Sequence, residues 1–114
     1  MKVSEIATLL DAKIICGEKH KDENIEKAFS SDLMSDVLRI DATNLLLMTG
    51  LSNLQTIRTA EMADIGYILF VRSKKVTPEM IKLACENEIV IMESPYSLFK
   101  ASGVLYNAGI NALY

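Results

Sequence analysis

The residues best placed to do chemistry follow three continuous apolar runs. If those runs are parallel strands, the residues after them gather at the carboxyl edge of one sheet, where open α/β sheets bind their ligands. Gly50 permits close backbone approach, and Ser52 or Asn53 would stand at a helix N-terminus, where free N–H groups favour an anion. The three sets are Thr49-Gly50-Leu51-Ser52-Asn53, Arg72-Ser73-Lys74-Lys75 and Glu93-Ser94.

A purely structural interpretation of the first set stays open. Ser52 or Asn53 is then a helix cap, and Gly50 is only a turn residue. Nothing in the chain matches GxGxxG, and no lysine follows a glycine-rich loop as in GxxxxGK[ST]. Classical nucleotide-binding loops are therefore absent.

A second candidate is the acidic segment that contains Asp32 and Asp36. The two carboxylates are four residues apart, so on a helix they share one face and could hold a hydrated divalent cation with help from a phosphate. The alternative is an N-cap at Ser31 or Asp32, with Asp36 exposed in the first turn. Metal-assisted phosphate chemistry is thus an alternative to a non-enzymatic role.

The combined prediction is one ligand-binding site with no catalytic residue, no resident metal and no cofactor. Hydroxyl and N–H groups supply donors, and Asp32 is an acceptor or a cation partner. The predicted ligand-binding residues are Ser31, Asp32, Thr49, Gly50, Ser52, Asn53 and Ser94.

Cysteine and histidine usage argues against nucleophilic catalysis and structural zinc. Cys16 and Cys85 are the only cysteines, and the single histidine, His20, lies in a polar turn. A structural zinc site needs paired short ligand spacings, which these three residues lack. We expect two reduced, buried thiols.

The elements that position these residues alternate between strand and helix. Runs without polar alternation indicate strands buried on both faces, and their alternation with helix-length segments indicates a parallel sheet. Ser4, Thr77 and Ser94 are predicted caps, and Gly109 a helix terminator. The 114 residues thus predict a single compact α/β domain, three layers with helices on both faces of a mostly parallel sheet. The expected strands are 13–16, 45–48, 67–71 and 89–92, with a further extended piece at 25–29, and the expected helices are 3–10, 31–40, 53–64, 78–87 and 95–107.

Composition and charge exclude several partners. The chain is 50% hydrophobic and has 12 basic against 15 acidic residues, a net charge of −3. It has no strongly basic run, which argues against nucleic-acid binding. Apolar runs such as Leu45 to Met48 are far short of the roughly 20 residues that cross a membrane. We expect a cytoplasmic protein that binds neither nucleic acid nor membrane.

One predicted helix has a mixed face that suggests a second subunit. In the segment 53–64, Arg58 and Glu61 project on the same side as Leu54 and Ile65. Charges on a buried side must be paired, which fits a subunit interface, although a surface ion pair fits equally well. We expect a homodimer that uses these four residues and the helix ending near Tyr106.

Four segments together resemble stand-alone DRTGG-domain proteins of anaerobic bacteria. The literal DRTGG string is missing, and Leu51-Ser52-Asn53 occupies the loop where related domains often carry Asp-Arg. The resemblance covers nearly the whole chain, and we expect residues 1–114 to form one DRTGG-like α/β domain. The segments are Phe29–Val37, Leu47–Asn53, Ile57–Met62 and Ser97–Tyr106.

The resemblance implies an α/β domain similar to the N-terminal domain of HPr kinase/phosphorylase. Related domains accompany CBS modules in regulated pyrophosphatases, as regulatory or assembly elements. The leading hypothesis is therefore a non-catalytic regulatory domain that self-associates and binds a nucleotide or phosphorylated metabolite. The alternative is a pure interaction module that docks on a partner kinase or redox enzyme.

Overall fold

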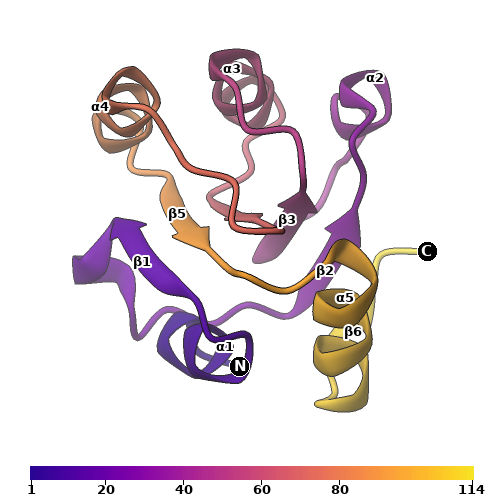
Figure 1. Ribbon diagram of the computed structural model, residues 1–114. Coiled ribbons are helices and arrows are strands. Elements are labelled where there is room, and N and C mark those ends of the chain that lie inside the picture. The colour runs from indigo at the N-terminus through magenta and orange to yellow at the C-terminus, as the bar shows by residue number, and fades with distance from the viewer.

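A six-stranded sheet forms the middle layer of the computed structural model, which describes all residues from Met1 to Tyr114 (Figure 1). Its strand order is β1-β5-β4-β3-β2-β6. All neighbouring strands are parallel except β1 and β5, which are antiparallel. The strands are β1 (Lys13–Cys16), β2 (Lys27–Ser30), β3 (Leu45–Thr49), β4 (Tyr67–Phe70), β5 (Val90–Glu93) and β6 (Asn111–Ala112).

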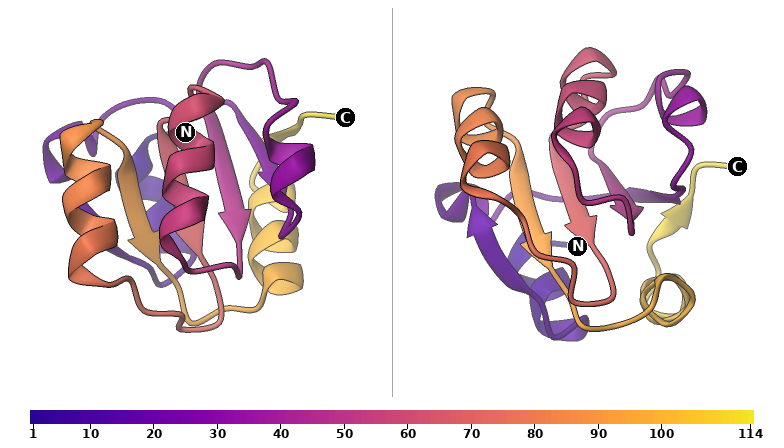
Figure 2. Two further views of the ribbon diagram at one scale, coloured as in Figure 1. Left: turned by 90° about the horizontal axis from the view of Figure 1, so that it is seen from above. Right: turned by 45° about the horizontal axis from the view of Figure 1, so that its top comes forward.

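Helices cover both faces of this sheet, so the predicted three-layer α/β fold is confirmed. The helices α2, α3 and α4 lie on one face, and α1 and α5 lie on the other (Figures 1 and 2). The strands β2, β3, β4 and β5 are linked in order through the first group, whereas α5 carries the chain from β5 across to the opposite edge. The helices are α1 (Val3–Leu9), α2 (Met34–Val37), α3 (Leu54–Met62), α4 (Pro78–Glu86) and α5 (Leu98–Asn107), with a 3-10 turn η1 (Glu18–His20).

Two hydrophobic cores, one on each face, explain the continuous apolar runs. Successive side chains of a strand point to opposite faces, so Leu45 and Leu47 of β3 join one core while Leu46 and Met48 join the other. All five residues of β3 are buried. Double burial of this kind is what the unbroken apolar pattern predicted.

The structure corrects three predicted helix starts. Helix α1 is preceded by Lys2, so Ser4 lies inside the helix instead of capping it. Helix α5 begins at Leu98, where Ser97 accepts a hydrogen bond from the Lys100 amide; Ser94 is not its cap. In the predicted helix 31–40 only Met34–Val37 is helical. Ser94 is misplaced as a cap because its hydroxyl donates instead to the distant Leu10 carbonyl.

Other local expectations are confirmed. Thr77 caps α4, where its hydroxyl accepts from the Met80 amide at 3.2 Å. Gly109, at φ +102°, follows the last helix in the left-handed conformation that favours glycine. None of the helices has the length and apolar character that a membrane span requires.

The prediction of two reduced thiols is wrong. Cys16 at the end of β1 and Cys85 in the last turn of α4 form a disulfide, with their Cα atoms 6.3 Å apart. The two cysteines are 69 residues apart, so the sequence gave no sign that they are close in space. They meet because α4 packs beside β1 at the edge of the sheet. A cysteine pair bridged in this way is not available as a pair of thiolate metal ligands.

Candidate functional site

The carboxylate of Asp32 joins the ends of β2 and β3. Its Oδ1 accepts hydrogen bonds from the Thr49 hydroxyl and the Gly50 amide, both at 2.8 Å. The Thr49 hydroxyl oxygen also accepts from the Leu51 amide at 3.1 Å. The other carboxylate oxygen, Oδ2, has no hydrogen-bond partner within the chain and is available to a ligand.

Arg72, which follows β4, reaches the same place from the next strand. A Cβ added to Gly50 would lie 3.2 Å from Arg72 Nη2 and 3.7 Å from both carboxylate oxygens of Asp32. The absence of a side chain at Gly50 therefore leaves space between a guanidinium and a carboxylate. These three residues are called the strand-end site below.

Backbone hydrogen bonds hold Arg72 in an uncommon conformation. Arg72 and Ser73 both have φ +56°, a region that non-glycine residues occupy rarely. The amides of Arg72 and Ser73 donate to the carbonyls of Tyr96 and Ser94, at 2.8 and 2.9 Å. The loop after β4 is thus joined to the loop after β5, which fixes the position from which Arg72 extends. The sequence placed Arg72 in one of the three sets that follow apolar runs, but Arg72 was not among the predicted ligand-binding residues.

The structure gives Ser31, Ser52 and Asn53 hydrogen-bond partners within the chain. The Ser31 hydroxyl accepts from the Leu33 amide at 3.0 Å. The Ser52 hydroxyl donates to the Lys75 carbonyl at 2.8 Å, and Asn53 caps α3 by accepting from the Thr56 amide at 2.9 Å.

Ser94 faces away from the strand-end site. Its hydroxyl is buried and donates to the Leu10 carbonyl at 2.6 Å, while accepting from the Tyr96 amide at 3.1 Å. These bonds connect the end of β5 to the segment after α1. Of the seven predicted residues, the structure thus brings Asp32, Thr49 and Gly50 together and holds the others by separate contacts.

Positive charge surrounds this edge without being fully neutralised. Arg72, Lys74 and Lys75 are exposed on one loop. Lys75 pairs with Glu93 at 3.6 Å, and the other Glu93 oxygen accepts from the Val76 amide at 2.9 Å. Arg72 and Lys74 form no ion pair within the chain.

The proposed pair of cation-binding carboxylates does not share a helix. Helix α2 begins at Met34, so Asp32 precedes it while Asp36 lies in its first turn. No group of three or more His, Cys, Asp or Glu side chains is arranged to hold a metal ion. Metal-assisted phosphate chemistry consequently receives no geometric support from Asp32 and Asp36.

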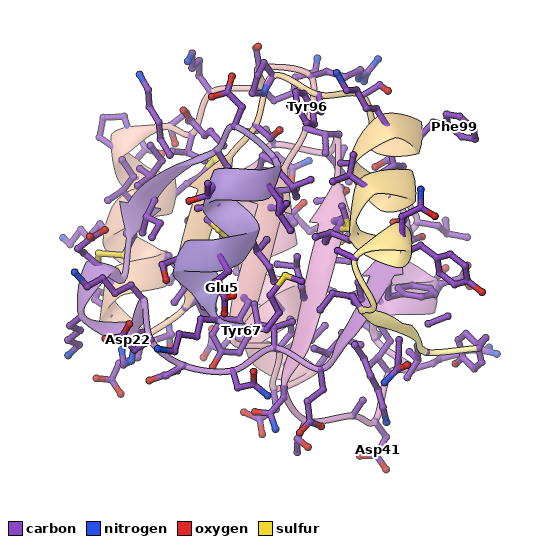
Figure 3. The ribbon with its side chains drawn as sticks, turned by 90° about the horizontal axis from the view of Figure 1, so that it is seen from below. Glu5, Asp22, Asp41, Tyr67, Tyr96 and Phe99 are labelled. Atoms are coloured by element: carbon purple, nitrogen blue, oxygen red, sulfur yellow. A yellow bond between two sulfur atoms is a disulfide. The ribbon has the colours of Figure 1, made fainter.

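A separate polar cluster lies at the opposite, amino edge of the parallel strands. The Tyr67 hydroxyl donates to Glu23 Oε1 at 2.6 Å, and His20 Nδ1 contacts Glu23 Oε2 (Figure 3 labels Tyr67). These hydrogen bonds, first the one from Tyr67, lower the pKa of the Glu23 carboxyl. Burial, together with the Glu23 charge, raises the pKa of Tyr67. The cluster joins the η1 segment to β4.

The four predicted interface residues divide between surface and core. Ile65 follows α3 and is buried in this chain's own core, so it is not available to a second subunit. Leu54 is half-buried, and Arg58 and Glu61 are exposed. No ion pair joins Arg58 to Glu61.

The chain has the architecture of a small three-layer α/β domain. Its fold is similar to part of a chain that comprises the CBS and DRTGG domains of the regulatory region of Clostridium perfringens pyrophosphatase, in a crystal structure complexed with the activator diadenosine tetraphosphate. The TM-score is 0.74 at 15% identity, over 91% of this chain and 45% of that chain. The likeness establishes a DRTGG-like fold, and this chain spans less than half of that protein's chain. No family model and no curated protein matches the sequence.

Proposed function

We propose that this domain is a non-catalytic regulatory element that binds a small anionic ligand of the nucleotide class at the strand-end site. The observation that carries the proposal is the approach of Arg72 to Asp32 across Gly50, where an added Cβ would lie within 3.7 Å of both side chains. A guanidinium binds phosphate with a planar set of donors. A neighbouring carboxylate accepts from sugar hydroxyls, as it does in other α/β folds.

Each residue of the site has a distinct role in this proposal. Arg72 binds the phosphate, and the exposed Lys74 adds positive charge on the same loop. Asp32 keeps its Oδ1 on Thr49 and Gly50, so its free Oδ2 accepts from a ribose hydroxyl. The Gly50 amide is already bonded to Asp32, and the phosphate therefore depends on Arg72 more than on backbone donors.

The likeness to a regulatory region complexed with a nucleotide activator is consistent with this role. The strongest competing function is an interaction module without a small ligand, docking on a kinase or redox enzyme. The two differ in whether the isolated domain binds a nucleotide.

Isothermal titration calorimetry with ADP and with diadenosine tetraphosphate tests the proposal. We expect saturable binding that Arg72→Gln weakens at least about tenfold, because a charge-assisted hydrogen bond to phosphate contributes roughly 1.5–3 kcal/mol. Arg39→Gln is the matched control, since Arg39 is exposed between α2 and β3, away from the strand ends. Equal nucleotide affinities of Arg72→Gln and Arg39→Gln, or no nucleotide binding by the parent protein, would reject the nucleotide role and favour the interaction module.

We propose in addition that two copies associate through the outer face of α3. Arg58 and Glu61 are exposed there without an ion pair, and the nearby Met62 side chain is 68% exposed. In a two-fold symmetric contact the same patch meets itself, so Arg58 of one copy can pair with Glu61 of its partner. An exposed methionine beside these charges provides apolar area.

Sedimentation velocity across protein concentration tests this association. The single variant Arg58→Glu should shift the population to monomer, and the double variant Arg58→Glu with Glu61→Arg should restore the dimer. A parent protein that stays monomeric at micromolar concentrations rejects the association. So does a double variant that behaves like the single one.

A further inference from the structure

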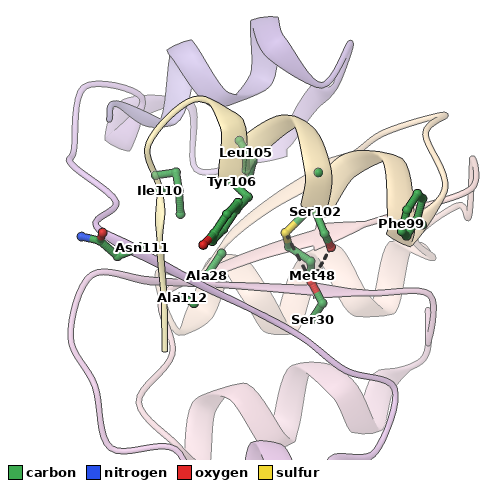
Figure 4. A pocket seen from close by; sticks show the side chains of 11 residues that line it. Ala28, Ser30, Met48, Phe99, Ser102, Leu105, Tyr106, Ile110, Asn111 and Ala112 are labelled. Atoms are coloured by element: carbon green, nitrogen blue, oxygen red, sulfur yellow. Dashed lines mark hydrogen bonds between the residues drawn. The ribbon is translucent and has the colours of Figure 1, made fainter. Parts of the chain in front are cut away.

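A cavity of about 340 Å³ lies between helix α5 and the β2–β6 edge of the sheet (Figure 4). It is distinct from the strand-end site and shares no residue with it. Its volume falls within the roughly 300–1,000 Å³ of small-molecule sites. The lining residues are Ala28, Ser30, Met48, Phe99, Ser102, Gly103, Leu105, Tyr106, Ile110, Asn111 and Ala112.

The chemistry of the lining selects an uncharged, apolar occupant. None of the eleven residues carries a charge, and seven are hydrophobic. The principal polar feature is a pair of hydroxyls, Ser30 Oγ and Ser102 Oγ, 2.7 Å apart (dashed in Figure 4). The Ser30 hydroxyl also donates to Met48 Sδ at 3.7 Å, so both protons of the pair have partners within the chain and the pair offers oxygen lone pairs to a ligand.

Two aromatic side chains of α5 belong to the lining but remain largely in water. Phe99 is 91% exposed and Tyr106 is 71% exposed. Residues seven apart on a helix lie on the same side, two turns from each other. These rings therefore leave aromatic faces free beside the cavity, on which a planar ligand can stack.

Gly103 lies between these two aromatic residues on the helix. A Cβ added there would meet no atom within 4 Å, so packing within the chain does not require glycine. The backbone of Gly103 does not have a positive φ either. Glycine inside a helix costs about 0.5–1 kcal/mol relative to alanine. Its effect here is to leave room in the cavity lining.

We propose that this cavity binds the planar, uncharged ring of the ligand, namely the nucleobase of a nucleotide whose phosphate Arg72 holds. The inference rests on the proposed function and names the ligand class more closely. Ser30 lines the cavity, and Asp32 stands two residues later, at most about 7 Å away along an extended chain. One nucleotide can therefore place its base between Phe99 and the serine pair and its ribose beside Asp32.

The test separates the two halves of the ligand by titrating adenosine and ribose 5-phosphate into the ¹⁵N-labelled protein. We expect adenosine to shift the amide signals of Ser30, Ser102 and Gly103, and ribose 5-phosphate to shift those of Gly50 and Arg72. Gly103→Leu should weaken adenosine binding at least about tenfold without lowering the melting temperature, because the new side chain enters open space. The same variant should leave ribose 5-phosphate binding unchanged.

Asn107→Leu is the matched control, because it adds an apolar side chain to an exposed position of α5 that does not line the cavity. Adenosine affinity should be the same in this variant as in the parent. Adenosine binding that survives Gly103→Leu overturns the inference, as does binding of ribose 5-phosphate alone, which leaves the proposed function standing. If the amide signals of α5 shift with protein concentration in the absence of nucleoside, this helix contacts a second copy of the chain. That result would also overturn the inference.

Discussion

The Cys16–Cys85 disulfide provides the sharpest test of how the fold is stabilised. It joins the edge strand β1 to the last turn of α4 across 69 residues of sequence. Cys85 is exposed whereas Cys16 is buried, so Cys85→Ser is the cleaner substitution. The serine hydroxyl is then in water, and the core around Cys16 keeps its side chain.

The size of the expected loss follows from the length of the closed loop. A crosslink that closes a loop of about 70 residues lowers the conformational entropy of the unfolded chain. By the loop-closure relation, this raises the free energy of unfolding by roughly 4 kcal/mol. A domain of this size changes its melting temperature by roughly 4 °C per kcal/mol, which predicts a decrease of about 15 °C. Glu88→Gln is a control, since it breaks only the exposed Lys19–Glu88 ion pair and should cost less than about 1 kcal/mol.

Differential scanning calorimetry with and without dithiothreitol measures this effect. The parent protein should lose about as much stability on reduction as it does in the Cys85→Ser variant, and that variant should not respond to the reductant. Melting temperatures within about 4 °C of one another for parent and variant, about what 1 kcal/mol produces, would refute the reasoning. A variant that still responded to dithiothreitol would refute it as well.

Four further outcomes are expected. Ser94→Ala should lower the free energy of unfolding by about 1–3 kcal/mol in urea titrations, because the buried Leu10 carbonyl loses its donor. Asn53→Ala should cost about 1 kcal/mol as a lost cap of α3, and unchanged nucleotide affinity in calorimetry would confirm that Asn53 is structural. The raised pKa of Tyr67 stabilises the fold below the ordinary tyrosine pKa near 10, so stability should fall as the pH rises above 10, and Tyr67→Phe should remove that fall. The lowered pKa of Glu23 stabilises the fold above about pH 4.5, and this contribution should disappear as the pH falls below that value; urea titrations from pH 3 to 6 on Glu23→Gln would show no such loss.

The apolar pattern was sufficient to predict the central strands β3, β4 and β5 but not the short edge strand β6. Leu45–Met48 has no polar alternation, and both cores need side chains from it, so double burial follows from the residues alone. Thr77 before Pro78 likewise placed the start of α4, because capping is a contact between residues close in sequence. Gly50 could be chosen for the candidate site because it follows a predicted strand, and Asp32 because it lies four residues from a second carboxylate, Asp36.

Contacts between distant residues could not be predicted in this way. Ser94 looked like a cap next to Pro95, but its hydroxyl bonds the Leu10 carbonyl, 84 residues away. Ile65 seemed to continue a helical face, but the chain leaves α3 and turns Ile65 into the core. Each residue offers a side chain that several partners could satisfy, and only the folded chain determines which partner is near.

The sequence by itself determined the layers of this protein, because burial on both faces of a strand and helix capping depend on neighbouring residues. The tertiary structure decided the rest: the disulfide, the approach of Arg72 to Asp32 across Gly50, and the open cavity beside Gly103. These features depend on strand order and on which helix covers which face. The strand order brings the ends of β2, β3 and β4 together, and the crossing of α5 to the far edge creates the cavity beside Ser30.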